Sequence, residues 1–221
     1  MSRITSARNT INYVANRSDK VILFYSAGKD SLTLLDLMAP YFKEIVLVHM
    51  YFVKDLDHVN RYIDWALNKY PNTTLMSVPH WNLTYVLRGG FYCVPNPKVK
   101  LMKLGDVDRA VKLQTGVEYS FFGMKKADSL NRRLMMRDGG LQGDKIYPLW
   151  EWTNKEVLAY MKAMKLPQPV RYSDKASGGV GFTSECFLWM QEHAPNDLEK
   201  MLKAFPLSEK ILIDANYGTQ V

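Results

Sequence analysis

The strongest constraint on the fold is a short apolar segment that runs directly into a polar loop. Residues 21–25 (VILFY) are apolar and rich in β-branched and aromatic side chains, which predicts a buried strand. The loop at residues 26–31 (SAGKDS) follows, and residues 30–38 (DSLTLLDLM) then carry apolar side chains at helical spacing until Pro40 ends the pattern. A strand, a tight turn and a helix in this order form the first half of a βαβ unit.

The same alternation of strand and helix continues along the chain. Apolar runs predict further strands at residues 45–50, 74–78 and 119–124. Amphipathic spacing and helix-capping signals predict helices at residues 3–17, 55–70, 106–114, 153–165 and 195–204. This alternation favours an α/β fold with a parallel sheet and right-handed crossovers.

Composition places the chain among compact globular proteins. It has 221 residues, of which 47% are hydrophobic, enough for a sizeable core. No apolar run approaches the roughly 18 residues of a membrane span, and the first residues lack the apolar region of a secretory signal. The two cysteines, Cys93 and Cys186, cannot form a disulfide framework and fit a reducing compartment. We therefore expect a cytoplasmic protein that does not bind a membrane.

The loop at residues 26–31 has the chemistry of a phosphate site. The start of a helix exposes N–H groups and a partial positive charge, and small residues let a phosphate approach the backbone. Ser26 and Ser31 add hydroxyl donors, and Lys29 adds a cation. The loop therefore predicts a phosphate-bearing ligand.

Two common phosphate-binding motifs do not match this loop. A Walker A loop requires serine or threonine after the lysine, where this chain has Asp30, and a glycine five residues before Gly28, where it has Leu23. A dinucleotide fingerprint requires three glycines, and Gly28 is the only one in the loop. The net charge of +7 fits an anionic ligand but does not distinguish a nucleotide from a nucleic acid.

Three segments of the chain resemble one known superfamily. Residues 26–31 are similar to the pyrophosphate-binding loop, Ser-x-Gly-x-Asp-Ser, of the adenine nucleotide alpha-hydrolases, which include the N-type ATP pyrophosphatases or PP-loop proteins. Residues 123–133 (GMKKADSLNRR) resemble the Gly-x-Arg-x-x-Glu/Asp-Ser…Arg segment of the phosphoadenosine phosphosulfate (PAPS) reductase-like branch. Residues 147–157 resemble its Pro-Leu…Trp-Thr…Asp/Glu-Val segment, so the likeness spans about residues 20–170.

The resemblance implies a fold and a division of the chain. The fold would be a Rossmann-like, doubly wound parallel sheet in a single domain with an irregular C-terminal extension. Residues 1–172 would form the nucleotide-binding α/β part. Residues 173–221 would form a glycine-rich segment, a possible lid at residues 173–184, and a helical extension.

The resemblance also implies a set of site residues. Those that would bind the nucleotide are Tyr25, Ser26, Ala27, Gly28, Lys29, Asp30, Ser31, His49, Met50, Gly123 and Arg133. Those that would act on the phosphates or on an attached sulfate are Lys29, Asp30, Lys126, and Arg132 or Arg133. Asp30 would also orient Mg²⁺, and either Lys125 or Lys126 replaces the usual arginine of the Gly-x-Arg segment. The alternative for His49 is a hydrogen-bonded histidine at the end of a strand.

The sequence around Cys186 leaves two interpretations open. Glu185-Cys186-Phe187-Leu188 partly matches the Glu-Cys-Gly-Leu-His ending of assimilatory PAPS reductases, whose thiol attacks the sulfonate. The alternative is a buried free cysteine in a helix that also contains Phe187, Leu188 and Met190. Because two distant cysteines cannot supply four thiolates, we expect no iron–sulfur cluster.

Three functions follow from the resemblance. The first is an enzyme that binds ATP with Mg²⁺ and cleaves it between the α- and β-phosphates to adenylate an acceptor in sulfur metabolism or nucleic-acid modification. The second is a PAPS or adenylyl-sulfate reductase that uses Cys186 as its nucleophile and thioredoxin as its partner. The third is a nucleotide-binding subunit that needs a partner such as a GTPase-like subunit or a nucleic acid.

Overall fold

The computed structural model describes residues 2–173 and 179–218. The chain divides into two compact units. The first comprises Met1–His49, Ile63–Ser77 and Ala110–Pro169, and the second comprises Met50–Tyr62, Val78–Arg109 and Val170–Val221. The proposed division into residues 1–172 and 173–221 stays a prediction. Part of the expected lid, residues 174–178, lies outside the described residues.

Helices and strands alternate through most of the chain. The strands are β1 Lys20–Phe24, β2 Glu44–Tyr51, β3 Thr73–Pro79, β4 Ser120–Phe122, β5 Leu141–Gln142 and β6 Lys145–Ile146. The α-helices are α1 Arg3–Ala15, α2 Lys29–Met38, α3 Asp57–Lys69, α4 Leu83–Gly89, α5 Leu104–Thr115, α6 Leu130–Met135, α7 Asn154–Ala163, α8 Ser184–His193, α9 Pro195–Ala204 and α10 Glu209–Tyr217. Two 3₁₀ turns are η1 Lys126–Asp128 and η2 Pro206–Ser208.

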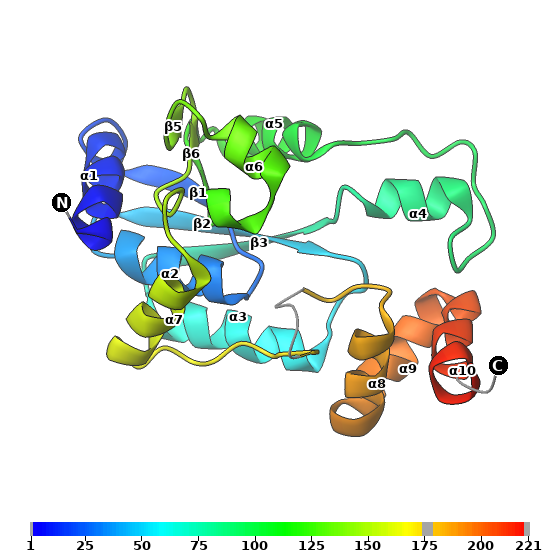
Figure 1. The fold of residues 1–221 in the computed structure, drawn as a ribbon. Coiled ribbons are helices and arrows are strands. Elements are labelled where there is room, and N and C mark those ends of the chain that lie inside the picture. The colour runs from blue at the N-terminus through cyan, green and yellow to red at the C-terminus, as the bar shows by residue number, and fades with distance from the viewer. Residues whose placement is uncertain (1, 174–178, 219–221) are drawn as a thin grey trace. The chain divides into compact units, whose positions relative to one another are not determined.

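The strands form one six-stranded sheet in the order β3-β2-β1-β4-β6-β5 (Figure 1). β1 is parallel to β2 and β4, β4 is parallel to β6, and the edge strand β5 runs antiparallel to β6. This confirms the expected Rossmann-like α/β fold. From β1 the chain continues to β2 and β3 on one side of the sheet, and it then returns to place β4 on the other side of β1. The direction of the strand order therefore reverses between β1 and β4. Ligands of such sheets bind at the carboxyl ends of the strands at this switch point.

Apolar packing makes the switch point rigid. Every residue of β4 and all but the first of β1 are buried. In the register of the sheet Phe24 lies opposite Phe122, and their rings stack with centroids 4.6 Å apart. Phe122 also stacks on Tyr147 at 5.4 Å. This aromatic row closes the core directly beneath the carboxyl ends of β1 and β4.

Helix α2 is anchored in its last turn by the partly buried carboxylate of Asp36. The hydroxyl groups of Tyr70 and Tyr160 donate to the two oxygens of Asp36, at 2.6 and 2.7 Å. Tyr160 belongs to α7, which packs against α2 on one face of the sheet (Figure 1). The loop at the N-terminus of α2 is therefore carried by a helix with a fixed position in the first unit.

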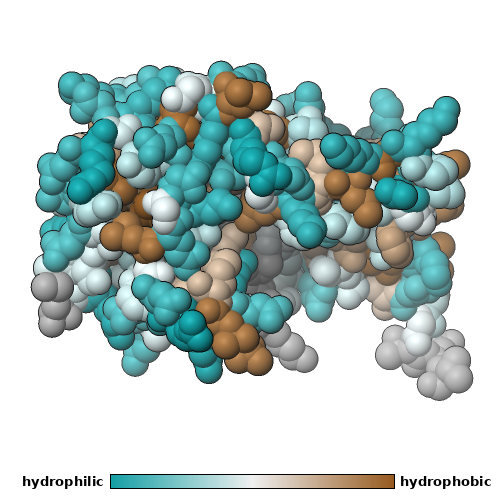
Figure 2. All heavy atoms as spheres, turned by 90° about the horizontal axis from the view of Figure 1, so that it is seen from above, coloured by the Kyte–Doolittle hydropathy of each residue, from teal (hydrophilic) through white to brown (hydrophobic). Residues whose placement is uncertain are grey.

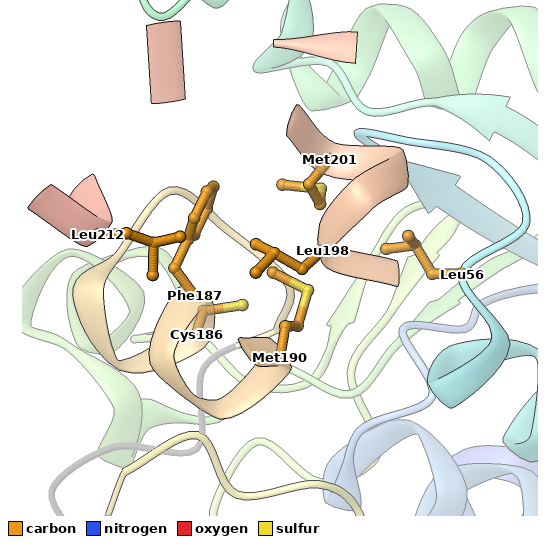
Figure 3. Packing of buried hydrophobic residues seen from close by; sticks show 7 residues of the cluster. All are labelled: Leu56, Cys186, Phe187, Met190, Leu198, Met201 and Leu212. Atoms are coloured by element: carbon orange, nitrogen blue, oxygen red, sulfur yellow. The ribbon is translucent and has the colours of Figure 1, made fainter. Parts of the chain in front are cut away.

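The second unit has a hydrophobic core of its own. Helices α8, α9 and α10 pack against the residues before α3 around an apolar cluster (Figure 3). Its buried members are Leu56, Cys186, Phe187, Met190, Leu198, Met201 and Leu212.

A buried carboxylate joins α9 to the start of α3 in this unit. Asp197 accepts the backbone N–H groups of Asp57 and His58 at 2.8 and 2.9 Å, so α9 caps α3. The imidazole Nδ1–H of His58 donates to the same carboxylate at 2.6 Å, and the His58 Nε2 lies within hydrogen-bond distance of the Tyr172 hydroxyl, at 2.7 Å. Burial acts to raise the pKa of Asp197, but the hydrogen bonds from His58, Asp57 and Lys200 outweigh it and lower the pKa to about 2.

Most predicted elements are confirmed, including α9 with its predicted bounds and the capping box of α7. In that box the Thr153 hydroxyl accepts from the Glu156 N–H, and the Glu156 carboxylate accepts from the Thr153 N–H. The strand predicted at residues 119–124 is present but shorter, as β4, and the prediction missed α4, α6, α10, β5 and β6. These elements are short or lack a periodic apolar pattern, so local signals do not reveal them.

The surface carries scattered apolar side chains. Leu130 and Leu134 of α6 are more than 60% exposed. Figure 2 shows mainly hydrophilic residues on the face seen from above, with hydrophobic residues in small separate groups. Scatter of this kind is normal for a protein surface. None of the described helices combines the length and the apolar character needed to cross a bilayer.

Candidate functional site

The loop between β1 and α2 turns sharply and leaves the start of the helix open. Ala27 has a left-handed backbone with φ 56°, which is unusual for a residue with a side chain. Gly28 is the N-cap of α2, and no side chain caps this end of the helix. The Ser31 hydroxyl donates to the Gly28 carbonyl at 3.0 Å and lies 3.3 Å from the Ser26 hydroxyl. The turn thus presents a helix N-terminus and two hydroxyl groups, as the sequence predicted.

Two lysines flank the carboxylate of this loop. The Nζ of Lys29 lies 3.0 Å from the Asp30 Oδ2, and the Nζ of Lys125 lies 2.6 Å from the Asp30 Oδ1. Lys29 is 9% exposed, and Lys125 is fully buried. A buried cation requires a paired carboxylate, because an unpaired charge away from water is costly.

Lys125 reaches the loop because β4 ends directly beside it. A Cβ atom on Gly123 would lie 3.1 Å from the Asp30 carbonyl carbon and 3.2 Å from its Cβ. Only glycine allows this approach without a shift of the backbone. Gly123 was predicted as a site residue, and its position is that of a spacer between the two segments.

A chain of alternating charges extends from the loop into the segment after β4. The Nζ of Lys125 lies 2.9 Å from the Asp128 Oδ1, and the Nη1 of Arg132 lies 2.5 Å from the Asp128 Oδ2. Burial acts to raise the pKa of Asp128, but hydrogen bonds from Lys125 and Arg132 outweigh it and keep the pKa below its usual range. We call the five residues Lys29, Asp30, Lys125, Asp128 and Arg132 the ion-pair chain. It joins two of the motifs on which the resemblance rests.

Lys126 and Arg133 are not part of the ion-pair chain. The Nζ of Lys126 lies over the Trp150 ring, 3.9 Å from its centroid, and Arg133 is exposed. Both line a hollow of about 250 Å³ together with Arg3, Ala127 and Glu151. Their predicted contact with the nucleotide phosphates stays a prediction.

His49 and Tyr25 lie together at the carboxyl ends of β1 and β2. The His49 Nδ1–H donates to the Tyr25 carbonyl at 3.2 Å, and Tyr25 itself is 1% exposed. Burial lowers the pKa of His49, against the opposing effect of this hydrogen bond. This arrangement fits the hydrogen-bonded histidine named as the alternative. Met50, predicted as its neighbour in the site, belongs to the second unit.

Cys186 is part of the apolar cluster of the second unit. It is 1% exposed, and its sulfur points toward Met190 and Leu198 (Figure 3). Burial raises the pKa of the Cys186 thiol to about 11. This placement matches the buried cysteine named as the alternative, and its role as nucleophile stays a prediction. The other thiol, Cys93, is partly exposed, and its Sγ lies 3.9 Å from the Val86 carbonyl oxygen.

The donor set at Asp30 does not fit a resident magnesium ion. Both carboxylate oxygens face lysine ammonium groups, at 2.6 and 3.0 Å. Mg²⁺ requires oxygen ligands around it, and an ammonium group in that place repels it. Among residues 2–173 and 179–218 no group of three or more His, Cys, Asp or Glu side chains is placed to hold a metal ion. The positive charge at this loop is supplied by lysines.

The sequence prediction left open whether Lys125 or Lys126 replaces the arginine of the motif, and it did not name Asp128 as a site residue. A usable signal was present, because the arginine of Gly-x-Arg stands two residues after the glycine, and Lys125 stands two residues after Gly123. Asp128-Ser129 then matches the Glu/Asp-Ser of the same motif. The spacing alone selects Lys125 over Lys126.

Solved structures of known proteins share this fold at low sequence identity. PAPS reductase from Candida auris, solved as a phosphate complex, aligns with a TM-score of 0.53 and 17% identity over 74% of this chain and 82% of its own. The U34-tRNA thiolase NcsA from Methanococcus maripaludis, solved with its [4Fe-4S] cluster, aligns with a TM-score of 0.50 and 16% identity over 94% of this chain and 79% of its own.

The NH3-dependent NAD synthetase from Campylobacter jejuni aligns with a TM-score of 0.50 and 13% identity over all of this chain and 98% of its own. A search of curated proteins found no match. A model of the phosphoadenosine phosphosulfate reductase domain matches residues 20–175 of this chain, which covers the whole sheet and the ion-pair chain. The chain therefore belongs to the phosphoadenosine phosphosulfate reductase domain family of the PP-loop superfamily.

Proposed function

We propose that this protein is an enzyme that binds ATP at the loop between β1 and α2 and cleaves it between the α- and β-phosphates. An acceptor would become adenylated and pyrophosphate would leave. The observation that carries the proposal is the ion-pair chain, in which Lys125 after β4 meets Asp30 of the loop at 2.6 Å. Two cations thus stand beside an uncapped helix N-terminus at the switch point of the sheet.

The charges of the ion-pair chain suit a polyphosphate. Its three cations and two carboxylates give these five residues a net charge of about +1, whereas a triphosphate is strongly negative. In the absence of nucleotide the Asp30 carboxylate pairs with both lysines. A phosphate would compete with Asp30 for the ammonium groups, and charge-assisted hydrogen bonds to phosphate are about twice as strong as neutral ones.

Each residue then has a stated task in the reaction. The N–H groups at the start of α2 and the hydroxyls of Ser26 and Ser31 would hold the phosphate oxygens in place. Lys29 and Lys125 would stabilise the charge that builds on the leaving pyrophosphate when the acceptor oxygen attacks the α-phosphorus. Positioning and preorganised charge are the main means by which proteins accelerate phosphoryl and nucleotidyl transfer.

The test compares three lysine-to-methionine variants by calorimetric titration with ATP. Lys29→Met and Lys125→Met each remove one cation from the site. Lys43→Met is the matched control, because Lys43 is exposed and pairs only with Asp19 within the described residues. A hydrogen bond to a charged group is worth about 1.5–3 kcal/mol, so both site variants should bind ATP at least about tenfold more weakly. The control should bind ATP as the wild type does.

The products distinguish this reaction from other uses of ATP. With α-labelled ATP and candidate acceptors, we expect label in an adenylated product or AMP, together with pyrophosphate. Label in ADP would show cleavage at the γ-phosphate and would contradict the proposal. Thermal unfolding of each variant separates a lost ligand contact from a lost fold.

A PAPS or adenylyl-sulfate reductase is the second candidate, and the family match at residues 20–175 favours it. Its nucleophile would be Cys186, which lies beyond the matched segment and is buried. Reduction of PAPS to sulfite that is abolished in Cys186→Ser would establish this function. Selective binding of PAPS over ATP would point the same way.

A further inference from the structure

Some residues that line the hollow beside α6 are neighbours in sequence of the ion-pair chain, but the hollow is lined by a different set of residues. Of the described residues that line it, Arg3, Lys126, Ala127, Arg133 and Glu151, none belongs to the ion-pair chain. It measures about 250 Å³. Pockets that bury an entire small-molecule ligand measure roughly 300–1,000 Å³, so this hollow suits one charged group rather than a whole nucleotide.

Lys125 and Lys126 are adjacent in sequence, but Lys125 belongs to the ion-pair chain and Lys126 lines the hollow. Lys125 has an extended backbone, with φ −130° and ψ 151°, and its buried ammonium faces Asp30 and Asp128. Lys126 begins the 3₁₀ turn η1, and its N–H donates to the Trp150 carbonyl at 2.9 Å. Its ammonium then lies over the Trp150 ring at 3.9 Å, where a cation–π contact holds it at the wall of the hollow.

The walls of the hollow carry an excess of positive charge. Arg3 is matched by Glu151 at 2.7 Å and lies 3.7 Å from Glu156. Lys126 and Arg133 have no carboxylate partner within the described part of the chain. Two cations that line one small hollow attract an oxyanion, and arginine is suited to bidentate hydrogen bonding with phosphate or sulfate.

We propose that this hollow binds a sulfate- or phosphate-type oxyanion carried by the acceptor substrate, while Lys125 and the loop bind the nucleotide. The proposal deepens the function proposed above and rests on it for the identity of the second ligand. It divides the basic residues of the segment after β4 between two ligands. Lys126 and Arg133 are then residues that select the acceptor rather than residues that bind ATP.

The experiment measures sulfate binding with the nucleotide site filled. The protein is saturated with α,β-methylene-ATP and titrated with inorganic sulfate at constant ionic strength in a calorimeter. The double variant Lys126→Gln/Arg133→Gln is compared with Arg137→Gln, whose side chain is exposed and pairs with Asp138. We expect sulfate affinity to fall at least fivefold in the double variant and to stay unchanged in Arg137→Gln. Affinity for the nucleotide analogue should stay within twofold in both.

Two outcomes would overturn the proposal. If sulfate binds equally well to the double variant, or does not bind the wild type, the hollow is not an oxyanion site. If the double variant also loses affinity for the nucleotide analogue, the hollow belongs to the nucleotide site. Failure of the proposed ATP function is seen separately, as an absence of analogue binding. In that case the loop is empty and competes with the hollow for sulfate. Sulfate is therefore titrated into Lys29→Met, which removes a cation from the loop, with and without the double substitution.

Discussion

The thiol of Cys186 decides between the two candidate enzymes, so its reactivity is the most informative property to measure. A nucleophilic cysteine reacts as the thiolate and needs access to its target. Cys186 has 1% of its surface exposed, and burial raises its pKa to about 11. We therefore predict that Cys186 is unreactive in the folded protein near neutral pH.

The expected magnitude follows from the shift in the pKa. The ordinary value is 9.0, so at pH 8 an unshifted thiol is about 10% ionised and Cys186 about 0.1%. The thiolate is thus about 100-fold less abundant, equivalent to about 2.7 kcal/mol. Limited access to the buried sulfur lowers the rate further. The rate should rise about tenfold for each pH unit between pH 8 and pH 10.

Alkylation by iodoacetamide provides the assay. The variant Cys93→Ser leaves Cys186 as the only thiol, and Cys186→Ser leaves Cys93 as the partly exposed comparison. N-acetylcysteine gives the rate of a free thiol, and the same variants in strong urea show that each thiol reacts once exposed. We expect Cys186 to react at least 100-fold more slowly than the free thiol at pH 8. A rate at pH 8 near that of the free thiol or above it, or a rate that no longer rises above pH 7, would refute the reasoning and favour the reductase.

Three further predictions concern stability and are measured by urea unfolding. Gly123→Ala should lower the free energy of unfolding by about 1–3 kcal/mol, because the new Cβ meets the Asp30 backbone at 3.1 Å; an unchanged value would mean that the loop yields freely. Asp197→Asn should lower the free energy of unfolding by about 2 kcal/mol at pH 7, whereas the exposed control Asp214→Asn should change it little. Since the native pKa of Asp197 is depressed to about 2, its contribution is complete above about pH 4 and is lost as the pH falls toward 2. A difference from wild type that does not shrink over that range would contradict this account. Ala27→Gly should be tolerated at φ 56°, whereas Ala27→Val should cost about 1–2 kcal/mol; equal stability of the two would show that this turn is not strained.

Local patterns of the sequence were sufficient for the framework of the first unit. Strand β1, helix α2 and the polar loop between them are encoded by neighbouring residues, because turn chemistry, helix capping and apolar periodicity act over a few positions. The prediction of a phosphate site on this loop rests on the same local signals. The family resemblance rests on the same loop and on two further short segments.

Motif spacing selects Lys125 as the counterpart of the arginine, but only the tertiary structure showed what Lys125 and Lys126 contact. The ammonium of Lys125 meets the loop at Asp30, and that of Lys126 lies over the Trp150 ring. The sheet places β4 beside β1, the absent side chain of Gly123 lets the segments touch, and the extended backbone at Lys125 turns its ammonium toward Asp30, 95 positions away in the chain.

Cys186 shows the same limit. Its neighbours in sequence suit both a reductase ending and a core helix, and the choice depends on packing in a cluster that includes the distant residues Leu56 and Leu198. A thiol pKa and the partner of a buried charge depend on which distant segments exclude water from them, and that exclusion arises only when the chain packs.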